Sequence, residues 1–308
     1  MKSFKYLIAI ATLGLAFVSC DHGLDPMGGK NTGGNGGGTG STGEISYEPA
    51  PCDNKVVAHR GGSRECGLPD NSRASLRYTM NLKCYASECD IYWTKDNNVI
   101  IAHADGEGKI NGLFPFKSTV TELRRAGKLS NGEELPTLEE FLEIVMIEGN
   151  CTKLMLDIKN ITGQSTDYPS NAVKRACEII KEKKAEKFCE FICTGQQTVA
   201  ATAAQCMVAY NIPIGWMGNA TPAEHKAKGF TWANLSAASY MTPYGAGKRT
   251  IKEFKDAGME ISVFNVDRAA GDGNAVYSDE AVAYYVSKID DLRCICTNYP
   301  SWLIKKIE

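Results

Sequence analysis

Two acidic residues occupy alternate positions in the apolar run ASECDIYWT. Glu88 and Asp90 are two residues apart, so on a β-strand their side chains point to the same face. Carboxylates at that spacing raise each other's pKa unless a cation lies between them. Asp157, in the later run LMLDI, can add a third oxygen ligand. Hard oxygen donors without clustered cysteine or histidine favour Mg²⁺ or Ca²⁺ over zinc. The alternative to a metal site is a pair of acids that faces solvent and has only a structural role.

Two histidines and two cations accompany these acids. The chain has four histidines, and His59 and His103 each end an apolar run, in KVVAH and NNVIIAH. A lone histidine in such a place is more often structural, but a pair can share the roles of general base and general acid. Arg60 can bind a phosphate with two parallel hydrogen bonds, and Lys159 can bind it as a point charge. With a divalent cation, these groups predict phosphoryl transfer from a diester.

These residues require a scaffold that brings distant strand ends together. From about residue 50, short apolar runs alternate with segments of helical periodicity, which is typical of βα units around a parallel sheet. Eight runs qualify as strands, and NNVIIAH adds a short strand after the second. We therefore predict an α/β fold, a single-domain (β/α)₈ TIM barrel with a short insertion after the second strand. An open doubly wound sheet is the rival, and the lack of a glycine-rich phosphate motif after the first strand disfavours it.

In such a barrel, the active site lies at the carboxyl ends of the strands. The polar residues that close the apolar runs are therefore expected to meet on one rim. They are His59, Arg60, Glu88, Asp90, His103, Asp157, Lys159, Asn265 and Asp267.

The N-terminal segment differs in composition from the rest. Residues 1–20 place two lysines before an apolar stretch that is too short for an ordinary spanning helix, and small residues lead to Cys20. We predict a lipoprotein-type signal peptide, with Cys20 lipidated in an exported, membrane-anchored protein of the periplasm or cell surface. An ordinary secretory signal is the alternative. Residues 21–49 are glycine-rich and predict a flexible tether, which leaves residues 50–308 as the catalytic domain.

The overall composition limits the class of partner. With 34 basic and 36 acidic residues, the formal net charge is -2, and no long run of one sign predicts a nucleic-acid partner. We expect a small phosphodiester substrate instead. The 12 cysteines include no C-x-x-C pair, and their spacing does not define disulfides. Buried free thiols are expected at Cys193, Cys294 and Cys296, and His225 is expected on the exposed face of a helix.

Several motifs follow one another in a specific order. The segments VVAHRGG, PDNS, ECDIYWTKDNNVIIAH, LPTLEEFLEI, LMLDIKN and ICTNYP extend from about Lys55 to Pro300. In this order they resemble the glycerophosphodiester phosphodiesterase family. Members of that family are TIM barrels of the phospholipase C-like group, and they hydrolyse glycerophosphodiesters to glycerol 3-phosphate and an alcohol. H-R-G alone is a weak signal, whereas the full set in register is a specific one.

The resemblance implies a metal-dependent phosphodiesterase that uses Mg²⁺ or Ca²⁺. It also implies that His59 and His103 are the acid/base pair. The metal ligands would be Glu88, Asp90 and Asp157, and the substrate-binding residues would be Arg60, Lys159 and Asp70. In the mechanism usually proposed for the family, a glycerol hydroxyl attacks phosphorus and water then opens the cyclic phosphate. The metal polarises the phosphoryl oxygens.

Four positions depart from the family's pattern. Asp70 and Asp157 replace glutamates, so both carboxylates have a shorter reach. Ala104 stands where an aspartate usually follows the second histidine, and Asn298 stands where many members carry aspartate. The changes at Ala104 and Asp157 motivate one alternative, a catalytically impaired barrel that binds phosphates or headgroups. A further alternative is a phospholipase C/D-like enzyme that acts on a related phosphodiester.

Overall fold

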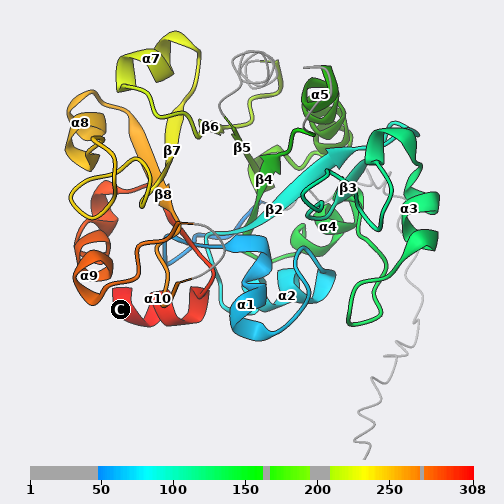
Figure 1. Ribbon diagram of the computed structural model, residues 1–308, viewed down its shortest axis with the longest axis horizontal. Coiled ribbons are helices and arrows are strands. Elements are labelled where there is room, and N and C mark those ends of the chain that lie inside the picture. Colours follow the sequence, from blue (N-terminus) through cyan, green and yellow to red (C-terminus); the bar gives the residue numbers. More distant parts are fainter. Residues whose placement is uncertain (1–47, 162–166, 195–208, 271–273) are drawn as a thin grey trace, which may run out of the picture. The chain divides into compact units, whose positions relative to one another are not determined.

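A closed barrel of parallel strands forms the centre of the protein (Figure 1). The computed structural model describes residues 48–161, 167–194, 209–270 and 274–308. Its sheet has nine strands; β3 lies outside the ring, and the other eight close it because β1 pairs with both β2 and β9. The ring strands are β1 (Val56–Ala58), β2 (Ala86–Trp93), β4 (Lys153–Ile158), β5 (Cys189–Cys193), β6 (Ile214–Trp216), β7 (Trp232–Ser236), β8 (Glu260–Phe264) and β9 (Ile295–Thr297).

This topology confirms the predicted (β/α)₈ TIM barrel. An open sheet has two unpaired edges, whereas the pairing of β1 with β2 leaves none in the ring. The rival doubly wound sheet is therefore excluded. The predicted insertion after the second strand is also present, and it begins with the extra strand β3 (Val99–Ile101).

Strand β3 reaches the rim in a different way from the ring strands. It pairs antiparallel with the end of β2, with Val99 opposite Trp93 and Ile101 opposite Ile91. The chain therefore leaves the barrel along β2, turns, and comes back along β3. A hydrogen bond from the amide of Ala102 to the carbonyl oxygen of Asp90 (3.2 Å) continues this return. The carboxyl end of β3 thus lies beside the rim, although β3 runs in the direction opposite to that of the ring strands.

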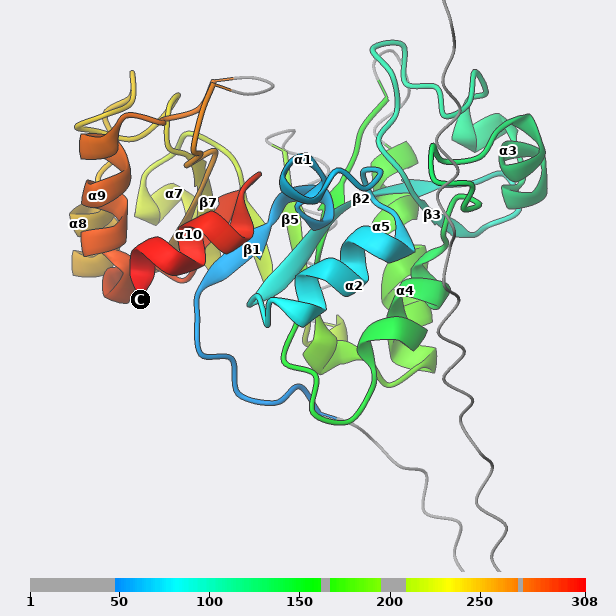
Figure 2. The same ribbon diagram turned by 90° about the horizontal axis from the view of Figure 1, so that it is seen from below.

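Helices cover the outside of the strands, and Figure 2 shows α2, α4 and α5 on one side with α8, α9 and α10 on the other. The helices are α1 (Ser63–Cys66), α2 (Arg73–Asn81), α3 (Val120–Ala126), α4 (Leu138–Val145), α5 (Asp167–Glu182), α7 (Pro222–Ala227), α8 (Ile251–Asp256), α9 (Asp279–Ser287) and α10 (Pro300–Ile307). Hydroxyl side chains define many of their starts. Capping boxes precede α2, α3, α4 and α7, at Ser72, Thr119, Thr137 and Thr221.

Side-chain alternation along the strands divides the core into two layers. On β4, Leu154, Leu156 and Ile158 belong to the layer between strands and helices, whereas Met155 belongs to the smaller cluster inside the barrel. Asp157 follows the phase of Met155 and so faces the barrel interior. The same period applies to β2, so polar residues of both strands lie above the apolar filling of the barrel.

The cysteine prediction is confirmed and the histidine prediction is wrong. Cys193, Cys294 and Cys296 are buried and free. His225 is fully buried, because α7 turns this residue inward against Trp216, with ring centroids 4.7 Å apart. Its Nε2 lies 3.2 Å from a backbone carbonyl oxygen. The short, charged sequence of α7 does not reveal which of its faces is covered.

The N-terminal predictions lie mostly outside the described residues. The signal peptide, Cys20 and nearly all of the tether precede residue 48. The divisions at residues 20 and 49 therefore remain predictions. Among the helices that the structure describes, none has both the length and the apolar character required to cross a bilayer.

Candidate active site

Three buried carboxylates meet at the carboxyl end of the barrel. Glu88 and Asp90 come from β2 and Asp157 from β4, and each offers an oxygen within 4.8 Å of the others. Asp90 and Asp157 are direct neighbours in the register of the two strands. All three side chains are buried. The described residues contain no second group of this kind, so the predicted acidic cluster has a defined place in the fold.

Two cations lie among these acids, and we call the five residues the rim cluster: Glu88, Asp90, Asp157, Arg60 and Lys159. Burial, followed by the charges of the other two acids, raises the pKa of Glu88 well above its ordinary value. Burial also raises the pKa of Asp157. Burial acts in the same direction on Asp90, but the charges of Lys159 and Arg60 outweigh it and lower the pKa of this acid. Three acids share two cations, so the rim cluster has a surplus of negative charge.

Lys159 connects two of the acids directly. Its Nζ lies 2.8 Å from Oδ1 of Asp90 and 2.5 Å from Oδ2 of Asp157. These contacts, with the charge of Glu88, raise the pKa of Lys159 well above its ordinary value despite its burial. The ammonium group, which we predicted to bind phosphate, therefore acts here as the counter-ion of the acids. The shorter Asp157 still reaches the cluster.

Arg60 contacts three acids through different atoms. Its backbone amide donates to Oε2 of Glu88 (2.9 Å), and its Nη1 lies 3.0 Å from Oδ2 of Asp70. Its Nε lies 3.2 Å from Oδ2 of Asp90. Asp70, which is partly exposed, is thus joined to the cluster through the guanidinium group. The predicted phosphate-binding arginine and the predicted substrate-binding acid form one contact pair.

A sharp turn after β1 allows Arg60 to make these contacts. Arg60 has a left-handed backbone conformation (φ 48°), and Gly61 (φ 78°) and Gly62 (φ 70°) follow it in the same region. A Cβ atom on Gly61 would collide with the side chain of Ser75 in α2. This position therefore requires glycine for both its conformation and its close approach. The H-R-G-G sequence is explained by this turn.

A short chain of hydrogen bonds links His59 through Asn298 to Asp267. Its Nδ1 lies 2.8 Å from Oδ1 of Asn298. The amide group of Asn298 donates from Nδ2 to Oδ2 of Asp267 (2.9 Å), and its backbone N donates to Oδ1 (2.8 Å). Because an ionised carboxylate only accepts, Nδ2 must face Asp267 and Oδ1 must face the imidazole. His59 therefore carries its proton on Nδ1.

The other ring nitrogen of His59 faces the acids. Nε2 lies 3.9 Å from Oε2 of Glu88, and in this tautomer it holds a lone pair. Burial, with the charge of Arg60, lowers the pKa of His59 and so favours the neutral ring. Sequence reasoning placed Asp267 at a strand end but gave it no role. Its link to His59 depends on Asn298, which is on the loop after β9.

His103 lies on the exposed side of the same cluster. Partial desolvation lowers its pKa, and the charges of Asp90, Arg60 and Lys159 also act on it. It follows β3 and is therefore outside the ring. The structure thus gathers all eight predicted site residues at one end of the barrel, with His103 at the margin.

The residue after His103 does not supply the acid that is missing there. Ala104 is buried in a small apolar cluster that β3 forms with the later part of the insertion. Asp105 accepts hydrogen bonds from the backbone amides of Glu107 and Lys109, both at 2.9 Å, and so is occupied by its own turn. His103 has no neighbouring carboxylate from this segment to orient it.

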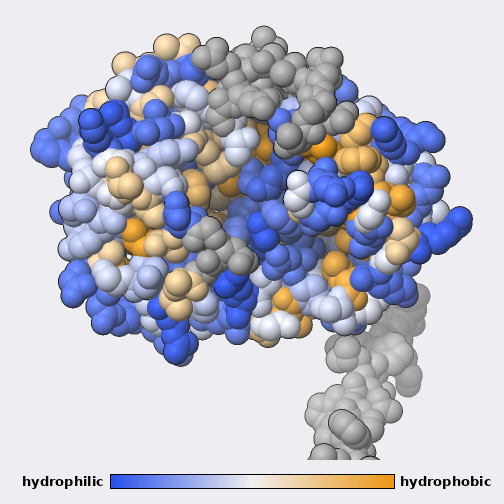
Figure 3. All heavy atoms as spheres, viewed as in Figure 1, coloured by the Kyte–Doolittle hydropathy of each residue, from blue (hydrophilic) through white to orange (hydrophobic). Residues whose placement is uncertain are grey.

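A cavity of about 480 Å³ opens beside the rim cluster, a size that suits a small ligand. One wall carries predicted site residues such as His59 and Lys159, and the opposite wall comes from β7, β8 and their loops. Sequence reasoning placed Asn265 of this wall at the rim but missed Asn234, Ser236 and Tyr240. The alternation in TWANLS was the available signal, because it turns both polar residues inward. On the face shown in Figure 3, hydrophilic side chains gather beside a central hollow.

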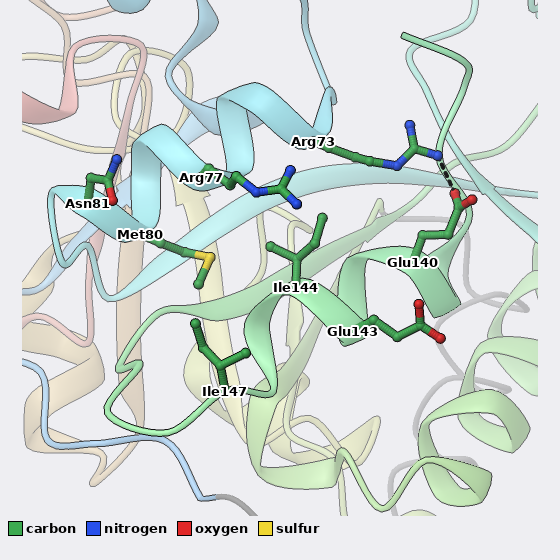
Figure 4. Close-up of a pocket in the computed structure, with 8 residues that line it drawn as sticks. All are labelled: Arg73, Arg77, Met80, Asn81, Glu140, Glu143, Ile144 and Ile147. Atoms are coloured by element: carbon green, nitrogen blue, oxygen red, sulfur yellow. Dashed lines mark hydrogen bonds and ion pairs between the residues drawn. The ribbon is translucent and has the colours of Figure 1, made fainter. Parts of the chain in front are cut away.

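A second hollow lies outside the barrel between α2 and α4 (Figure 4). Its charged side chains neutralise each other, with Nη2 of Arg73 2.5 Å from Oε2 of Glu140. Met80 and Ile144 form its apolar side. None of the eight predicted site residues lines it. The groove lacks the surplus charge found at the rim.

Comparison with known proteins identifies the family of this chain. The sequence model of the glycerophosphoryl diester phosphodiesterase family matches residues 59–301, from the first candidate histidine to the start of α10. The chain belongs to this family. A glycerophosphodiester phosphodiesterase of Caldanaerobacter subterraneus subsp. tengcongensis is 29% identical over 103 residues. That match covers 29% of this chain and 40% of the relative, so it spans less than half of the relative's length.

Solved structures show the same fold in family members. A glycerophosphodiester phosphodiesterase from Parabacteroides distasonis superposes with a TM-score of 0.63 at 23% identity, over 84% of this chain and 98% of that one. A phosphodiesterase from Oleispira antarctica, in complex with the product sn-glycerol-3-phosphate, superposes with a TM-score of 0.59 at 18% identity, over 82% and 96%. The family resemblance inferred from the motifs is confirmed.

Proposed function

We propose that this protein hydrolyses glycerophosphodiesters to glycerol 3-phosphate and an alcohol, with the help of a divalent metal ion. The observation that carries the proposal is the rim cluster, where three buried acids share two cations beside His59 and an open cavity. Family membership supports the same reaction class. In the Oleispira antarctica relative, the bound ligand is sn-glycerol-3-phosphate, which is the product expected here.

The residues fit a hard divalent cation. Oδ1 of Asp157 is buried without a hydrogen-bond partner, and the raised pKa values of Glu88 and Asp157 indicate that the acids lack sufficient positive charge. Glu88, Asp90 and Asp157 would hold Mg²⁺ or Ca²⁺ through oxygen atoms. Such an ion would polarise the phosphoryl oxygens and help to lower the pKa of the attacking hydroxyl group.

The two imidazoles divide the proton transfers. His59, with its lone pair on Nε2, accepts the proton of the attacking glycerol hydroxyl group. His103 donates a proton to the oxygen of the leaving alcohol. In the second half-reaction the two roles are exchanged, and water opens the cyclic phosphate. With a metal ion held by the acids, Arg60 and Lys159 would be released from their role as counter-ions to bind the phosphate oxygens, and Asp70 contributes to substrate binding beside Arg60.

An activity assay with a set of variants tests the proposal. We expect purified protein with Mg²⁺ or Ca²⁺ to release glycerol 3-phosphate from glycerophosphocholine, and a chelator to stop the release. His59→Ala should lower kcat by about 100- to 10,000-fold, because it removes the general base. His225→Ala provides a matched control for loss of an imidazole away from the rim. Unchanged turnover by His59→Ala would contradict the mechanism.

Two other functions are separated by the same assay. Ala104, which leaves His103 without an adjacent acid, favours a barrel that binds phosphodiesters but no longer cleaves them. Calorimetric binding of glycerophosphocholine without turnover, across both metals, would support that function. A phospholipase C/D-like reaction predicts cleavage of intact lipids, and mass spectrometry of the products would identify it.

We also propose export and lipid anchoring, with support from the sequence alone. Residues 1–20 have the pattern of a lipoprotein signal, and residues 21–49 have the composition of a tether. Mass spectrometry of the N-terminal peptide from purified membranes should show acylated Cys20. Cys20→Ser should release the protein from the membrane fraction, and retention of that variant would argue against the anchor.

A further inference from the structure

Two cysteine thiols face each other at the end of the barrel opposite the rim cluster. Sγ of Cys52 lies 2.9 Å from Sγ of Cys151. A disulfide bond is about 2.05 Å long, so an approach of less than about 1 Å would bring the sulfurs to bonding distance. Cys151 is buried and Cys52 is partly exposed. The two residues are 99 positions apart in the chain, so local sequence does not impose their contact.

Backbone contacts hold these thiols together independently of the sulfur atoms. The amide of Ala50 donates to the carbonyl oxygen of Asn150 (2.8 Å), which joins the start of the described domain to the turn before β4. Both thiols lie near the carbonyl oxygen of Lys83, Cys52 at 3.2 Å and Cys151 at 3.6 Å. Three chain segments therefore converge on this point, and the thiols lie between them.

We propose that Cys52 and Cys151 form a disulfide bond in the mature protein. Nothing in the proposed hydrolysis uses either residue, so this inference stands apart from the proposed function. The site is a redox modification site, and its co-reactant is a disulfide, either a small molecule such as oxidised glutathione or a protein thiol oxidase.

The exchange is balanced in two steps. The thiolate of the more accessible Cys52 attacks a sulfur of the oxidant, which forms a mixed disulfide and releases one thiol. The thiolate of Cys151 then attacks the sulfur of Cys52 and displaces the second thiol. Together, Cys52 and Cys151 lose two electrons and two protons, and the oxidant is reduced to two thiols. Burial and the adjacent thiol raise the pKa of Cys52 to about 12, so its thiolate is scarce once the protein has folded. We therefore place the exchange during folding, before the two thiols are covered.

The bond would enclose a functional part of the chain. The loop between Cys52 and Cys151 contains both candidate catalytic histidines and two of the three acids of the rim cluster. It would also join the segment that follows the predicted tether to the residues that precede β4. Closing a long loop restricts the unfolded chain, so the bond is expected to stabilise the native state.

The full chain, purified in detergent, reduced and unfolded, and then refolded in a mixture of reduced and oxidised glutathione, tests the inference. Free thiols are alkylated after unfolding, and the digest is analysed by mass spectrometry. We expect a cross-linked peptide pair containing Cys52 and Cys151, which reduction separates. Alkylation of both residues, or a cross-link from either one to the nearby Cys84, would overturn the inference.

Thermal unfolding supplies a second measurement. A reductant should lower the Tm of the oxidised wild-type protein by about 5 to 10 °C. Cys52→Ser should have a Tm that reductant does not change, whereas the control Cys66→Ser, which alters a partly exposed thiol of α1, should keep the full shift. If Cys52→Ser does not fold, the wild-type peptide map still decides. An equal Tm with and without reductant in the wild type would contradict the bond.

Discussion

The rim cluster and the charged residues at the base of the barrel use the same types of side chain in different proportions. At the base, Glu190 is the buried acid, and it is surrounded by donors. Nζ of Lys153 lies 3.0 Å and Nη2 of Arg293 2.8 Å from its Oε1, and the hydroxyl group of Tyr85 donates to the same oxygen at 2.6 Å. One buried acid has two cations at the base, whereas three buried acids share two cations at the rim.

The pKa directions show what this difference means. Burial alone would raise the pKa of Glu190, but Arg293 and Lys153 outweigh it and lower the pKa. At the rim, burial and neighbouring acids leave the pKa of Glu88 raised. The cations at the base compensate the burial of Glu190, whereas the rim acids lack sufficient counter-charge, which the proposed divalent cation would supply. β4 contributes to both ends, with Lys153 at the base and Asp157 at the rim.

The largest effect is expected from breaking the base. Glu190→Gln should lower the free energy of unfolding by about 3 kcal/mol, because Lys153 and Arg293, both partly buried, lose the charge of the buried acid that they share. Denaturant titration measures this loss. kcat and KM should stay near those of the wild type, since the site is at the other end of the barrel.

A matched variant and the loss of stability at low pH test the role of Glu190 further. Glu260 pairs with the same Arg293 but is exposed, so Glu260→Gln should cost less than about 1 kcal/mol. The folded pKa of Glu190 is below its unfolded value. Its contribution is therefore complete above an unfolded pKa of about 4.3 and is lost as pH falls through the folded pKa. Equal losses for the two variants would contradict the comparison.

The rim should respond in the opposite way. Glu88→Gln keeps an oxygen that can accept a hydrogen bond from the amide of Arg60. It removes a carboxyl group whose pKa is raised in the folded state. We expect the free energy of unfolding in metal-free buffer to rise, because ionising Glu88 is less favourable in the native state than in the unfolded chain. Turnover should fall more than about 100-fold through weaker metal binding. A destabilised variant with full activity would show that the rim acid is structural.

The smallest effect concerns the orientation of His59. Asp267→Asn removes the carboxylate that fixes the amide group of Asn298, so we expect kcat to fall about 10- to 100-fold with KM unchanged. The exchange variant Asp267→Asn/Asn298→Asp restores one amide and one carboxylate, and it should recover most of the lost kcat. Steady-state kinetics distinguish the cases. Failure of the exchange to recover activity, in a variant with wild-type stability, would argue against a role in positioning.

The parts of the site that follow from local alternation were predictable from the sequence. Glu88 and Asp90 share a face because a strand has a period of two, and Asp157 joins them once the strands form a ring. The barrel itself follows from the regular alternation of strand and helix patterns. These inferences need only the period of each element and the rule that strand ends meet at one rim.

The parts that depend on distant contacts were not predictable. The chain of contacts from Asp267 to His59 exists because β8, β9 and β1 are neighbours in the ring and two side chains meet beyond their ends. The burial of His225 depends on which face of a short helix is covered. The pairing of Glu190 with Arg293 joins residues 103 positions apart, and no pattern in either segment indicates it.

The antiparallel course of β3 gives the two imidazoles different mechanical supports. His59 directly follows β1, a ring strand that is paired with a neighbouring strand on both sides. His103 is carried by a hairpin that is attached to the ring along one edge only. Under the proposed mechanism, a change in the length or sequence of that hairpin would move the group that donates a proton to the leaving alcohol, while the barrel keeps the general base in place.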